Sequence, residues 1–536
     1  MQMSTSAHVD TFCRDNLPAP EQCAELIFEL PELHYPDRLN CAVELLDAVA
    51  DRLGEDRPCL HAPGAETWTY GDLLATANRI ANVLVDDLGI VPGNRVLLRG
   101  PNNPWLVAAW FATLKAGAVA VSTMPLLRAG ELSTIHEIAQ ISASICDHRF
   151  LADVEASSID TPVLAYGGTG ADDLVQRSAD RPDTFSAVDT AADDVALLAF
   201  TSGTTGRPKA TMHFHRDLLA IADTFSRHLL EPTPDDVFTG TPPIAFTFGL
   251  GGAVVFPLRV GASTLLIEKA GPAELAGLIA EYGVTVCFTA PTAYKAMIAS
   301  SDLSLLSTLR TAVSAGEHLP AATWQTFKER TGVAIIDGIG STEMLHIFIS
   351  ASGADIRPGS TGKAVPGYVA TILDEDGNPV PPGTPGRLAV KGPTGCRYLA
   401  DSRQAAYVDN GWNVTGDTFT CDDDGYFWYQ ARSDDMIISS GYNIAAPEVE
   451  EAVLRHPDVE ECGVVGVPDE ARGALVKAFV VLRDGVAGNE EKAKELQDFT
   501  KQVVAPYKYP RIVEFVEELP RTATGKLQRF RLRDHD

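Results

Sequence analysis

The sequence is short of positive charge. Its 536 residues contain 43 Lys and Arg against 72 Asp and Glu, which gives a formal net charge of −29. Nucleic acids and anionic membrane surfaces are bound mainly through Lys and Arg, so this balance argues against either as the main partner. The simplest explanation of the excess acid is that it favours solubility.

Long apolar runs are also absent. No eighteen-residue apolar stretch without a charge occurs, and the nearest candidate is interrupted by Lys115. The segment Met1–Asp10 lacks the basic and apolar regions of a signal peptide. We therefore expect a soluble, cytoplasmic protein with no membrane partner.

Paired cysteines are missing as well. The chain has nine cysteines, an odd number, and no C-x-x-C pair. This pattern predicts neither a disulfide framework nor a zinc site. His213 and His215 lie close together but have no partners at metal-ligand spacing, so we interpret them as loop or helix-start residues.

The chain is longer than one hydrophobic core usually supports, about 250–300 residues, so two or more domains are expected. Residues 65–290 alternate helical patterns with short β-rich runs, which is typical of an α/β fold with largely parallel sheets. Residues 358–432 contain short strands between turns and indicate a small β-rich subdomain. We expect a large N-terminal domain over 1–432 and a small α+β domain over 433–536.

Within the small domain, the patterns predict strands at 475–482 and 512–516 and a helix at 490–504. In the large domain, an apolar stripe from Leu73 to Leu84 predicts a helix, and residues 195–200 predict a buried strand.

A loop rich in hydroxyls, glycines and cations follows the strand at 195–200. Glycines let backbone N–H groups converge on an anion, and the hydroxyls and cations add donors and charge. The alternative is a flexible connector, but a predicted helix after the loop, with apolar residues from Leu218 to Leu229, favours an anion-binding loop. A Walker A loop is excluded because Lys209 is followed by Ala210 and does not directly follow a glycine. The loop comprises Thr201, Ser202, Gly203, Thr204, Thr205, Gly206, Arg207, Pro208 and Lys209.

This loop closely resembles the phosphate-binding motif of the acyl-adenylate-forming superfamily, which includes acyl-CoA synthetases, adenylation domains of peptide synthetases and luciferases. Further segments that resemble the family's motifs follow in the family's order over almost the whole chain. The resemblance implies that ATP binds at the loop, through Thr201 to Gly206 and Lys209, and also at Gly316 and Glu317. It also implies that the small C-terminal domain is mobile.

The segment from Asp337 to Glu343 resembles the family's second nucleotide motif. The resemblance implies that Glu343 holds Mg²⁺, that Thr342 contacts the α-phosphate, and that Asp337 and Gly338 border the adenine. The family often has an aromatic residue where this chain has Ile339, so its adenine contact is expected to be aliphatic. On its residues alone, such a segment is equally compatible with a purely structural turn.

Other positions are assigned by the same resemblance. Asp417 matches the carboxylate that accepts the ribose hydroxyls, and Arg432 matches its partner at the sugar. Asp434 matches the hinge residue about which the C-terminal domain rotates between the half-reactions. Lys526 matches the adenylation lysine, a cation between two anions that must approach each other.

The segment after the hinge is expected to line the channel for coenzyme A. It contains Ser440, Gly441 and Tyr442, and the glycine would lie beside the pantetheine arm, where a side chain would block the channel. Without the resemblance, an ordinary Ser/Gly hairpin would explain the same residues.

The segment 242–251 matches the wall of the family's acyl pocket. Its aromatic residues and glycines suit a flat ring better than a long alkyl tail, although an apolar core segment is the competing explanation. Residues 337–348 resemble benzoate-CoA ligases, and residues 395–401 and 430–432 resemble the 2-aminobenzoate-CoA ligase branch. We expect the pocket to consist of Phe246, Thr247, Phe248, Gly249, Ala315, Gly340 and His346, with Thr247 or His346 bonded to an ortho substituent.

Together these features predict an aryl-CoA ligase that adenylates an ortho-substituted benzoate with ATP and Mg²⁺ and transfers it to coenzyme A. We favour 2-aminobenzoate, with salicylate and benzoate as alternatives, and expect a monomer or homodimer. One competing function is a stand-alone adenylation enzyme that loads a carrier protein. Another is a non-catalytic nucleotide-binding module, which would not require Lys526 and Glu343.

Overall fold

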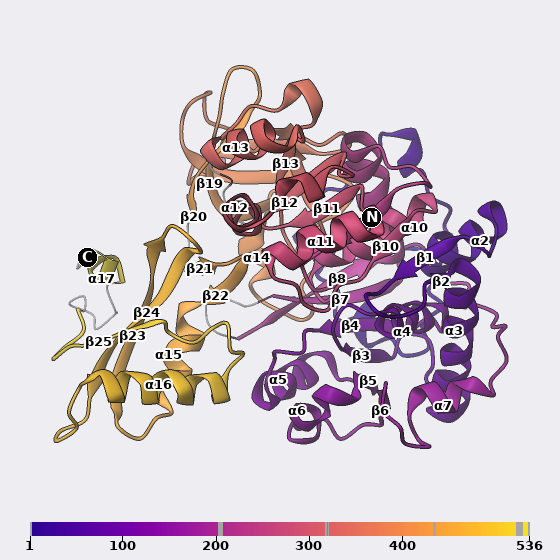
Figure 1. Cartoon of the computed structure of the whole chain (residues 1–536), viewed down its shortest axis with the longest axis horizontal. Helices are drawn as coiled ribbons and strands as arrows, with labels where there is room; N and C mark the ends of the chain where they lie inside the picture. Colours follow the sequence, from indigo (N-terminus) through magenta and orange to yellow (C-terminus); the bar gives the residue numbers. More distant parts are fainter. Residues whose placement is uncertain are drawn as a thin grey trace.

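The structure is a computed structural model that describes residues 3–201, 207–316, 319, 321–432, 436–520 and 529–533. It has a large lobe from the N-terminus to strand β20 and a smaller lobe from β21 onward, seen on the left of Figure 1. The predicted α/β organisation, with a large N-terminal and a small C-terminal domain, is confirmed. The predicted boundary between 432 and 433 stays a prediction because residues 433–435 lie outside the described ranges.

The first sheet of the large lobe has the strand order β6-β5-β3-β4-β7-β8. Its first five strands run parallel, and β8 returns antiparallel to β7. The predicted helix at 73–84 is α3 (Tyr70–Asn82) with a π-helical extension, and it packs against the apolar helix α4 (Pro104–Lys115). The strands are β3 (Arg95–Arg99), β4 (Val119–Thr123), β5 (Ala143–Asp147), β6 (Val163–Tyr166), β7 (Val195–Thr201) and β8 (Lys209–Phe214).

The second sheet has the order β15-β14-β13-β12-β11-β9-β10-β1-β2. Strands β13, β12, β11, β9, β10 and β1 are parallel, so their carboxyl ends meet at one edge, where ligands bind in open α/β sheets. The strands are β1 (Pro58–His61), β2 (Trp68–Thr69), β9 (Val237–Gly240), β10 (Ser263–Leu265), β11 (Val286–Thr289), β12 (Thr311–Ala315), β13 (Ile335–Gly340), β14 (Ile347–Ser350) and β15 (Lys363–Ala364).

A small antiparallel sheet completes the large lobe and agrees with the β-rich subdomain predicted over 358–432. It consists of β16 (Val369–Leu373), β17 (Gly386–Lys391), β18 (Val408–Asp409), β19 (Trp412–Cys421) and β20 (Phe427–Arg432).

The small lobe begins with the hairpin of β21 (Met436–Ser439) and β22 (Tyr442–Ala445). Its main sheet contains β23 (Val459–Asp469), β24 (Gly473–Leu482) and β25 (Ile512–Phe515), with helices α15 (Ala446–Leu454), α16 (Glu490–Val503) and α17 (Arg529–Arg533). The lobe has its own core, in which Ile444, Val464, Val480 and Leu496 are buried. The elements predicted at 475–482, 490–504 and 512–516 are therefore confirmed to within two residues.

The predicted order of strand, loop and helix around residue 201 is wrong in one respect. The chain after the loop forms β8, paired with β7, before α8 (His215–Ile221) begins. His213 consequently lies in a strand, whereas His215 does begin the helix. The loop is thus the connection of a β-hairpin and does not lead directly into a helix N-terminus.

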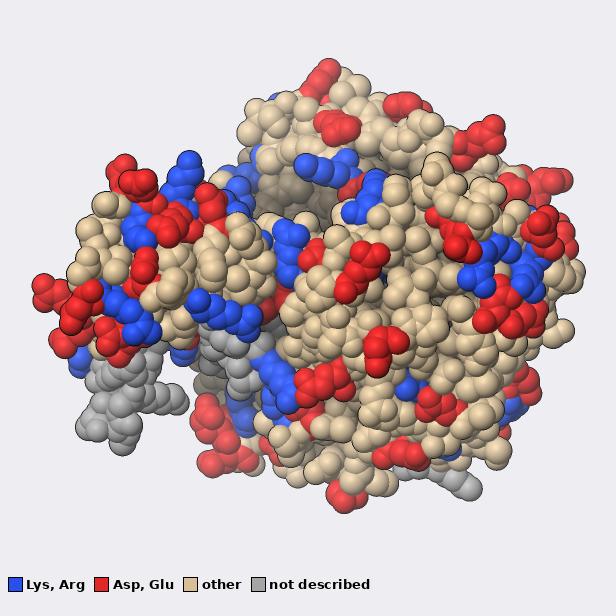
Figure 2. Space-filling view, turned by 90° about the horizontal axis from the view of Figure 1, so that it is seen from below, with Lys and Arg blue, Asp and Glu red and all other residues tan. Residues whose placement is uncertain are grey.

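None of the helices in the described ranges is long and apolar enough to cross a membrane. Figure 2 shows acidic side chains scattered over most of one face, with Lys and Arg side chains gathered around a hollow where the two lobes meet.

Candidate active site

A cavity of about 750 Å³ lies between the two lobes. Its wall in the large lobe follows the carboxyl ends of β9, β11, β12 and β13, where Thr241, Ala290, Gly316 and Ser341 line it. The small lobe contributes the turn of the β21–β22 hairpin and one face of α15. The site is therefore assembled by both lobes at the sheet edge where parallel strands end.

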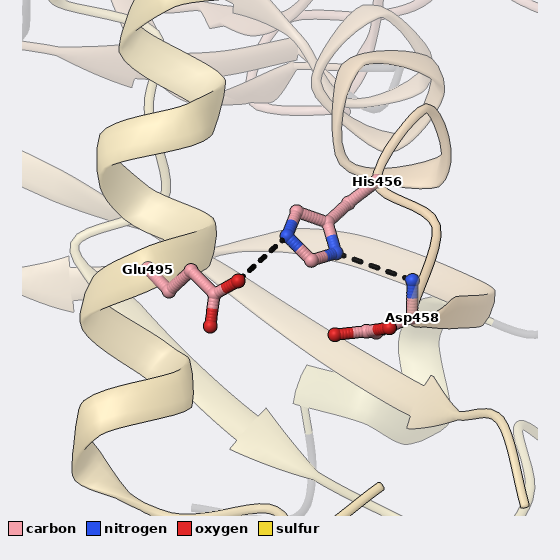
Figure 3. A group of neighbouring side chains, drawn as sticks. All are labelled: His456, Asp458 and Glu495. Atoms are coloured by element: carbon pink, nitrogen blue, oxygen red, sulfur yellow. Dashed lines mark hydrogen bonds and ion pairs between the residues drawn. The ribbon is translucent and has the colours of Figure 1, made fainter.

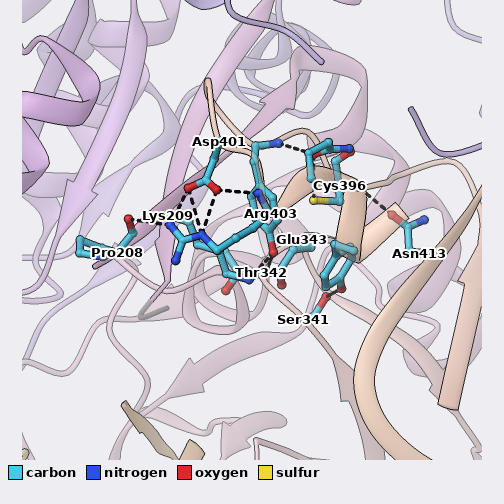
Figure 4. Close-up of polar contacts among 12 residues, drawn as sticks. Pro208, Lys209, Ser341, Thr342, Glu343, Cys396, Asp401, Arg403 and Asn413 are labelled. Carbon is cyan, nitrogen blue, oxygen red and sulfur yellow. Dashed lines mark hydrogen bonds and ion pairs between the residues drawn. The ribbon is translucent and has the colours of Figure 1, made fainter. Parts of the chain in front are cut away.

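Lys209, at the start of β8, forms a compact cluster with Glu343 and Tyr398. Its Nζ lies 3.2 Å from Glu343 Oε1 and 4.4 Å from the centre of the Tyr398 ring, and it also hydrogen-bonds the Tyr398 hydroxyl. The Tyr398 hydroxyl in turn donates to Glu343 Oε1 at 2.5 Å. Figure 4 shows Lys209, Thr342 and Glu343 close together, beside the segment that contains Cys396 and Arg403.

The charge of Glu343 is set by this cluster. Burial raises the pKa of Glu343, but the Lys209 ammonium and the Tyr398 hydroxyl outweigh burial, so the pKa lies below its usual value. Burial and the neighbouring Glu343 carboxylate raise the pKa of Tyr398, which keeps its hydroxyl protonated. Glu343 is therefore a charged carboxylate next to the cavity residue Thr342.

The segment 397–399 pairs antiparallel with β8 along the edge of β8 that faces away from β7. Met212 N–H donates to the Arg397 carbonyl at 2.7 Å, and Leu399 N–H donates to the Ala210 carbonyl at 2.9 Å. Arg403 donates to the carbonyl of Arg207 at 3.0 Å and so fixes the chain that leads into β8. This pairing explains how Tyr398, far from Lys209 in sequence, reaches it.

A second network, largely buried, links β8 and the start of α8 to Thr342 and to the segment 397–399. His213 Nε2 lies 2.8 Å from the Thr342 carbonyl, and Arg397 donates to Asp217 Oδ2 at 2.7 Å. His213 and Asp217 are both inaccessible to solvent. Burial raises the pKa of Asp217, but Arg397, the His213 hydrogen bond and Arg216 together outweigh burial, and the pKa falls to about 2.

Asp337 lies at the middle of β13 and has one unpaired carboxyl oxygen. Its Oδ1 is buried and has no hydrogen-bond partner. Burial raises the pKa of Asp337 to about 8, and Ser314 and the Gly338 main chain oppose this only in part. An unpaired buried oxygen of this kind is costly in isolation and fits the donor group of a ligand.

Most of the residues predicted to form the acyl pocket line the cavity, although their role in binding the acid stays a prediction. Phe246, Thr247, Phe248, Ala315, Gly340 and His346 all line the cavity. Gly249 lies behind this wall in the short helix α9 (Thr247–Leu250), where a Cβ would come within 2.2 Å of the Pro243 carbonyl oxygen. Its lack of a side chain lets α9 pack closely on the preceding segment.

His346 lies at the aromatic end of this pocket. Its ring centroid lies 4.6–6.3 Å from those of Phe225, Phe248, Phe256 and Phe288. Neither buried ring nitrogen has a partner within hydrogen-bond geometry, although the Phe248 main chain is near enough to oppose the lowering of the pKa in part. Burial lowers the pKa of His346 to about 3, so the imidazole is neutral near pH 7.

Comparisons with known proteins show which family the chain belongs to. Residues 46–398 match the AMP-binding enzyme family, and residues 448–526 match the AMP-binding enzyme C-terminal domain. The chain belongs to the AMP-binding enzyme family.

Three relatives of this AMP-binding enzyme are informative. Benzoate–CoA ligase from Thauera aromatica is 35% identical over 515 residues, which cover 94% of this chain and 97% of the relative. 3-Hydroxybenzoate–CoA ligase from Aromatoleum sp. (strain CIB) is 33% identical over 513 residues, or 92% and 97% of the two chains. The solved structure of the anthranilate CoA ligase AuaEII in complex with anthranoyl-AMP has a TM-score of 0.72 and 34% identity, covering 94% and 99%. The expected aryl-CoA ligase branch is thereby confirmed.

In this AMP-binding enzyme, Asp417 and Arg432 are Cα partners in the antiparallel pairing of β19 and β20. Thr201 is the last residue of β7. Thr201, Gly316 and Thr342 all line the cavity. Gly338 and Ile339 follow Asp337 in β13. The predicted residues Ser202, Gly203, Thr204, Thr205, Gly206, Glu317, Asp434 and Lys526 lie outside the described ranges.

The small lobe inserts its hairpin turn into the cavity. Ser440, Gly441 and Tyr442 all line it, and a Cβ at Gly316 would lie 3.9 Å from the Gly441 carbonyl oxygen. Ser440 and Gly441 both have positive φ, 50° and 79°, which gives the turn its tight reversal. The centroid of the Tyr442 ring lies 6.3 Å from that of Phe246 in the predicted acyl pocket.

The donor set fits a Mg²⁺ ion at Glu343. Magnesium is usually held by one or two carboxylates together with substrate phosphates, and Glu343 supplies a charged carboxylate beside Thr342. Lys209 and the Tyr398 hydroxyl both contact Oε1 of that carboxylate, so a nucleotide phosphate that attracted Lys209 would leave Oε1 with the Tyr398 hydrogen bond alone.

Figure 3 shows a different cluster, His456, Asp458 and Glu495, in the small lobe. His456 Nδ1 accepts a hydrogen bond from Asp458 N–H, and Nε2 lies 3.2 Å from Glu495. Lys492 pairs with both carboxylates, at 2.7 Å and 2.6 Å. With an ammonium group already between the acids, this cluster is an ion-pair network that ties α16 to the chain before β23.

Tyr398, His213, Asp217 and Arg397 were missed as functional residues from the sequence. One signal was present. Residues 209–214 alternate polar and apolar side chains, which predicts a strand with Lys209 and His213 on one face.

Proposed function

We propose that this aryl-CoA ligase activates an ortho-substituted benzoate, with 2-aminobenzoate favoured. The observation that supports the proposal is His346, a neutral imidazole with unpaired nitrogens that lines the cavity beside Phe246 and Phe248 and packs against further phenylalanines behind it. A flat ring fills such a pocket, and a polar ring substituent would supply the missing hydrogen bond. Thr247 adds a hydroxyl on the same wall.

The benzoate, 3-hydroxybenzoate and anthranilate ligases among the relatives support an aromatic acid but leave the substituent open. A site built to hydrogen-bond a substituent discriminates strongly against an acid that lacks it, because the site's polar group is then left unpaired. A dominant preference for one substituted benzoate is therefore expected.

In the first half-reaction, a carboxylate oxygen of the acid forms a bond to the α-phosphorus of ATP, and the bond to pyrophosphate breaks. Glu343 and Tyr398 hold Lys209 at the start of β8, where its ammonium group can form ion pairs with the nucleotide phosphates. Thr342 and Lys526 are assigned to the α-phosphate, with Lys526 as the cation between the reacting anions. Mg²⁺, when bound to Glu343, would neutralise phosphate charge.

Asp337 is assigned to the adenine. Its unpaired Oδ1 would accept a hydrogen bond from the exocyclic amino group. Asp417 and Arg432, opposite each other on β19 and β20, are assigned to the ribose.

In the second half-reaction, the coenzyme A thiol loses its proton and its sulfur bonds to the acyl carbon, while the bond from that carbon to AMP breaks. Ser440, Gly441 and Tyr442 lie on the cavity wall where the thiol would arrive. We assign the change between the two steps to rotation of the small lobe about Asp434.

The test is mass spectrometry of the products formed from ATP, Mg²⁺, coenzyme A and a panel of acids. The panel holds benzoate, 2-aminobenzoate, 3-hydroxybenzoate, salicylate and octanoate. We expect 2-aminobenzoyl-CoA to dominate, whereas octanoyl-CoA as the main product would contradict the pocket assignment. Aryl-AMP without a thioester would point to an acceptor other than coenzyme A.

Matched variants separate the two polar candidates. His346→Phe keeps the ring but removes both nitrogens, and Thr247→Val keeps the branched shape but removes the hydroxyl. We expect at least one of them to lower the preference for 2-aminobenzoate over benzoate about tenfold, the effect of one lost hydrogen bond of ~1.4 kcal/mol. An unchanged preference in both would refute the assignment.

A further inference from the structure

A buried ion-pair cluster joins the two lobes at the cavity wall. Lys508 of the small lobe is 5% exposed, and its Nζ lies 2.5 Å from Glu131 Oε1 and 2.6 Å from Glu448 Oε1. Glu131 belongs to helix α5 (Ala129–Ala139) of the large lobe, and Glu448 belongs to α15 of the small lobe. All three line the cavity that the β21–β22 hairpin enters.

Glu131 is held in place by its own helix. It is the third residue of α5, and its Oε2 accepts a hydrogen bond from Arg128 N–H at 2.9 Å, which caps the helix. Its other oxygen faces Lys508. The large lobe therefore presents a fixed acceptor, which lowers the entropy cost of forming the ion pair.

Lys508 is directly connected to the hairpin that lines the cavity. The preceding residue, Tyr507, stacks on Tyr442 with ring centroids 4.1 Å apart and planes 22° apart. Tyr442 in turn approaches Phe246 of the large lobe. The position of Lys508 and the position of the hairpin turn are thus coupled by one continuous packing contact.

The charges of the cluster permit the link to open. In the closed arrangement, one ammonium serves two carboxylates, and Glu448 Oε2 is buried without a partner. Burial and Glu131 raise the pKa of Glu448 to about 7, against the effect of Lys508. If the lobes separated, Lys508 would keep Glu448 as a one-to-one partner, while Glu131 would return to solvent. Opening would leave no unpaired charge buried in the small lobe.

We propose that the Glu131–Lys508 ion pair is a latch that holds the small lobe with Ser440–Tyr442 against the cavity and thereby favours thioester formation over adenylation. The proposal rests on the two-step function proposed above. A purely structural ion pair would affect both half-reactions alike.

The test uses full-length Glu131→Gln, in which the amide oxygen can still cap α5 but the charge is lost. The matched control is Glu281→Gln, which removes one exposed charge on α11 (Pro272–Tyr282). Adenylation is measured as acid-dependent ATP–pyrophosphate exchange without coenzyme A. The second half-reaction is measured as thioester formation from supplied 2-aminobenzoyl-AMP and coenzyme A.

We expect Glu131→Gln to slow thioester formation about tenfold, as a modest shift of a two-state equilibrium would, while exchange stays within about twofold of the wild type. Glu281→Gln should change neither rate. Equal loss of both half-reactions in Glu131→Gln, or no loss in either, overturns the latch.

Hydrogen–deuterium exchange gives a second readout that does not depend on activity. The amides of β21 and β22 should exchange faster in Glu131→Gln than in the wild type. Their exchange rate in Glu281→Gln should equal that of the wild type. Unaltered protection of the hairpin in Glu131→Gln overturns the latch, even if the wild type forms no thioester. A wild type that forms aryl-AMP but no thioester instead refutes the proposed function.

Discussion

Replacing Arg397 by Met is expected to destabilise the large lobe by leaving a buried carboxylate without its main partner. Asp217 is inaccessible to solvent, and its pKa of about 2 lies below the usual 3.8. This lowering of the pKa corresponds to about 2 kcal/mol of stabilisation. A depressed carboxyl pKa gives stability that is present above pH ~4 and is lost as pH falls through about 2.

Removing the cation does more than cancel this contribution, since an uncompensated buried charge typically costs about 3–5 kcal/mol. His213 and Arg216 still face Asp217, which favours the lower end of that range. For a cooperative unit of roughly 430 residues, such a loss lowers the thermal midpoint by about 3–6 °C.

Differential scanning fluorimetry between pH 4 and pH 8 is the assay. The deficit of Arg397→Met should be largest at neutral pH and shrink toward pH 4, where Asp217 can take up a proton. The double variant Arg397→Met/Asp217→Asn should recover part of the loss because no buried charge remains. A deficit that is independent of pH, or a double variant less stable than the single one, would refute the reasoning.

Three further predictions concern the site. Tyr398→Phe removes the hydroxyl that donates to Glu343, a charge-assisted bond worth about 1.5–3 kcal/mol, and should raise the KM for ATP about tenfold or more in steady-state kinetics. Gly251→Ala places a Cβ 2.4 Å from the His346 ring, so kcat/KM for the aryl acid should fall at least tenfold while the KM for ATP changes little. Asp337→Asn should raise the thermal midpoint of the ligand-free enzyme increasingly between pH 5 and pH 8, because a raised folded-state pKa of about 8 costs stability as pH rises.

Each of these has an outcome that contradicts it. An unchanged KM for ATP in Tyr398→Phe would show that the Tyr398 hydroxyl does not contribute to nucleotide binding. Equal losses for acid and ATP in Gly251→Ala would indicate a general folding defect. A midpoint difference in Asp337→Asn that is the same at pH 5 and pH 8 would mean that the carboxyl carries no buried charge.

The sequence predicted the layered α/β fold and the small lobe because hydrophobic periodicity is a local signal. The resemblance of segment 242–251 to the family's acyl-pocket segment also predicted Phe246, Thr247 and Phe248 as wall residues, and all three line the cavity. Strand β8 was missed because the apolar residues that follow it repeat at helical spacing and drew the predicted helix toward the loop.

The supporting network could not be predicted for a different reason. Lys209 and Tyr398 are 189 residues apart. Their contact depends on the pairing of residues 397–399 with β8, which no local sequence pattern indicates. The same holds for Arg397 and Asp217, 180 residues apart. Such pairs become visible only when the chain is folded, because both partners look like ordinary polar residues within their own segments.

The division of the cavity between two lobes has an evolutionary consequence. The described residues around the His346 ring all belong to the large lobe, whereas Gly441, Tyr442 and Lys508 come from the small one. If these residues have the roles proposed above, substitutions that change the acid need not disturb the surface that meets the acceptor, and the reverse also holds. A lineage could change its preference for the acid and keep its preference for the acceptor, or the reverse. Only contacts that cross between the lobes, such as that of Tyr442 with Phe246, would have to be preserved.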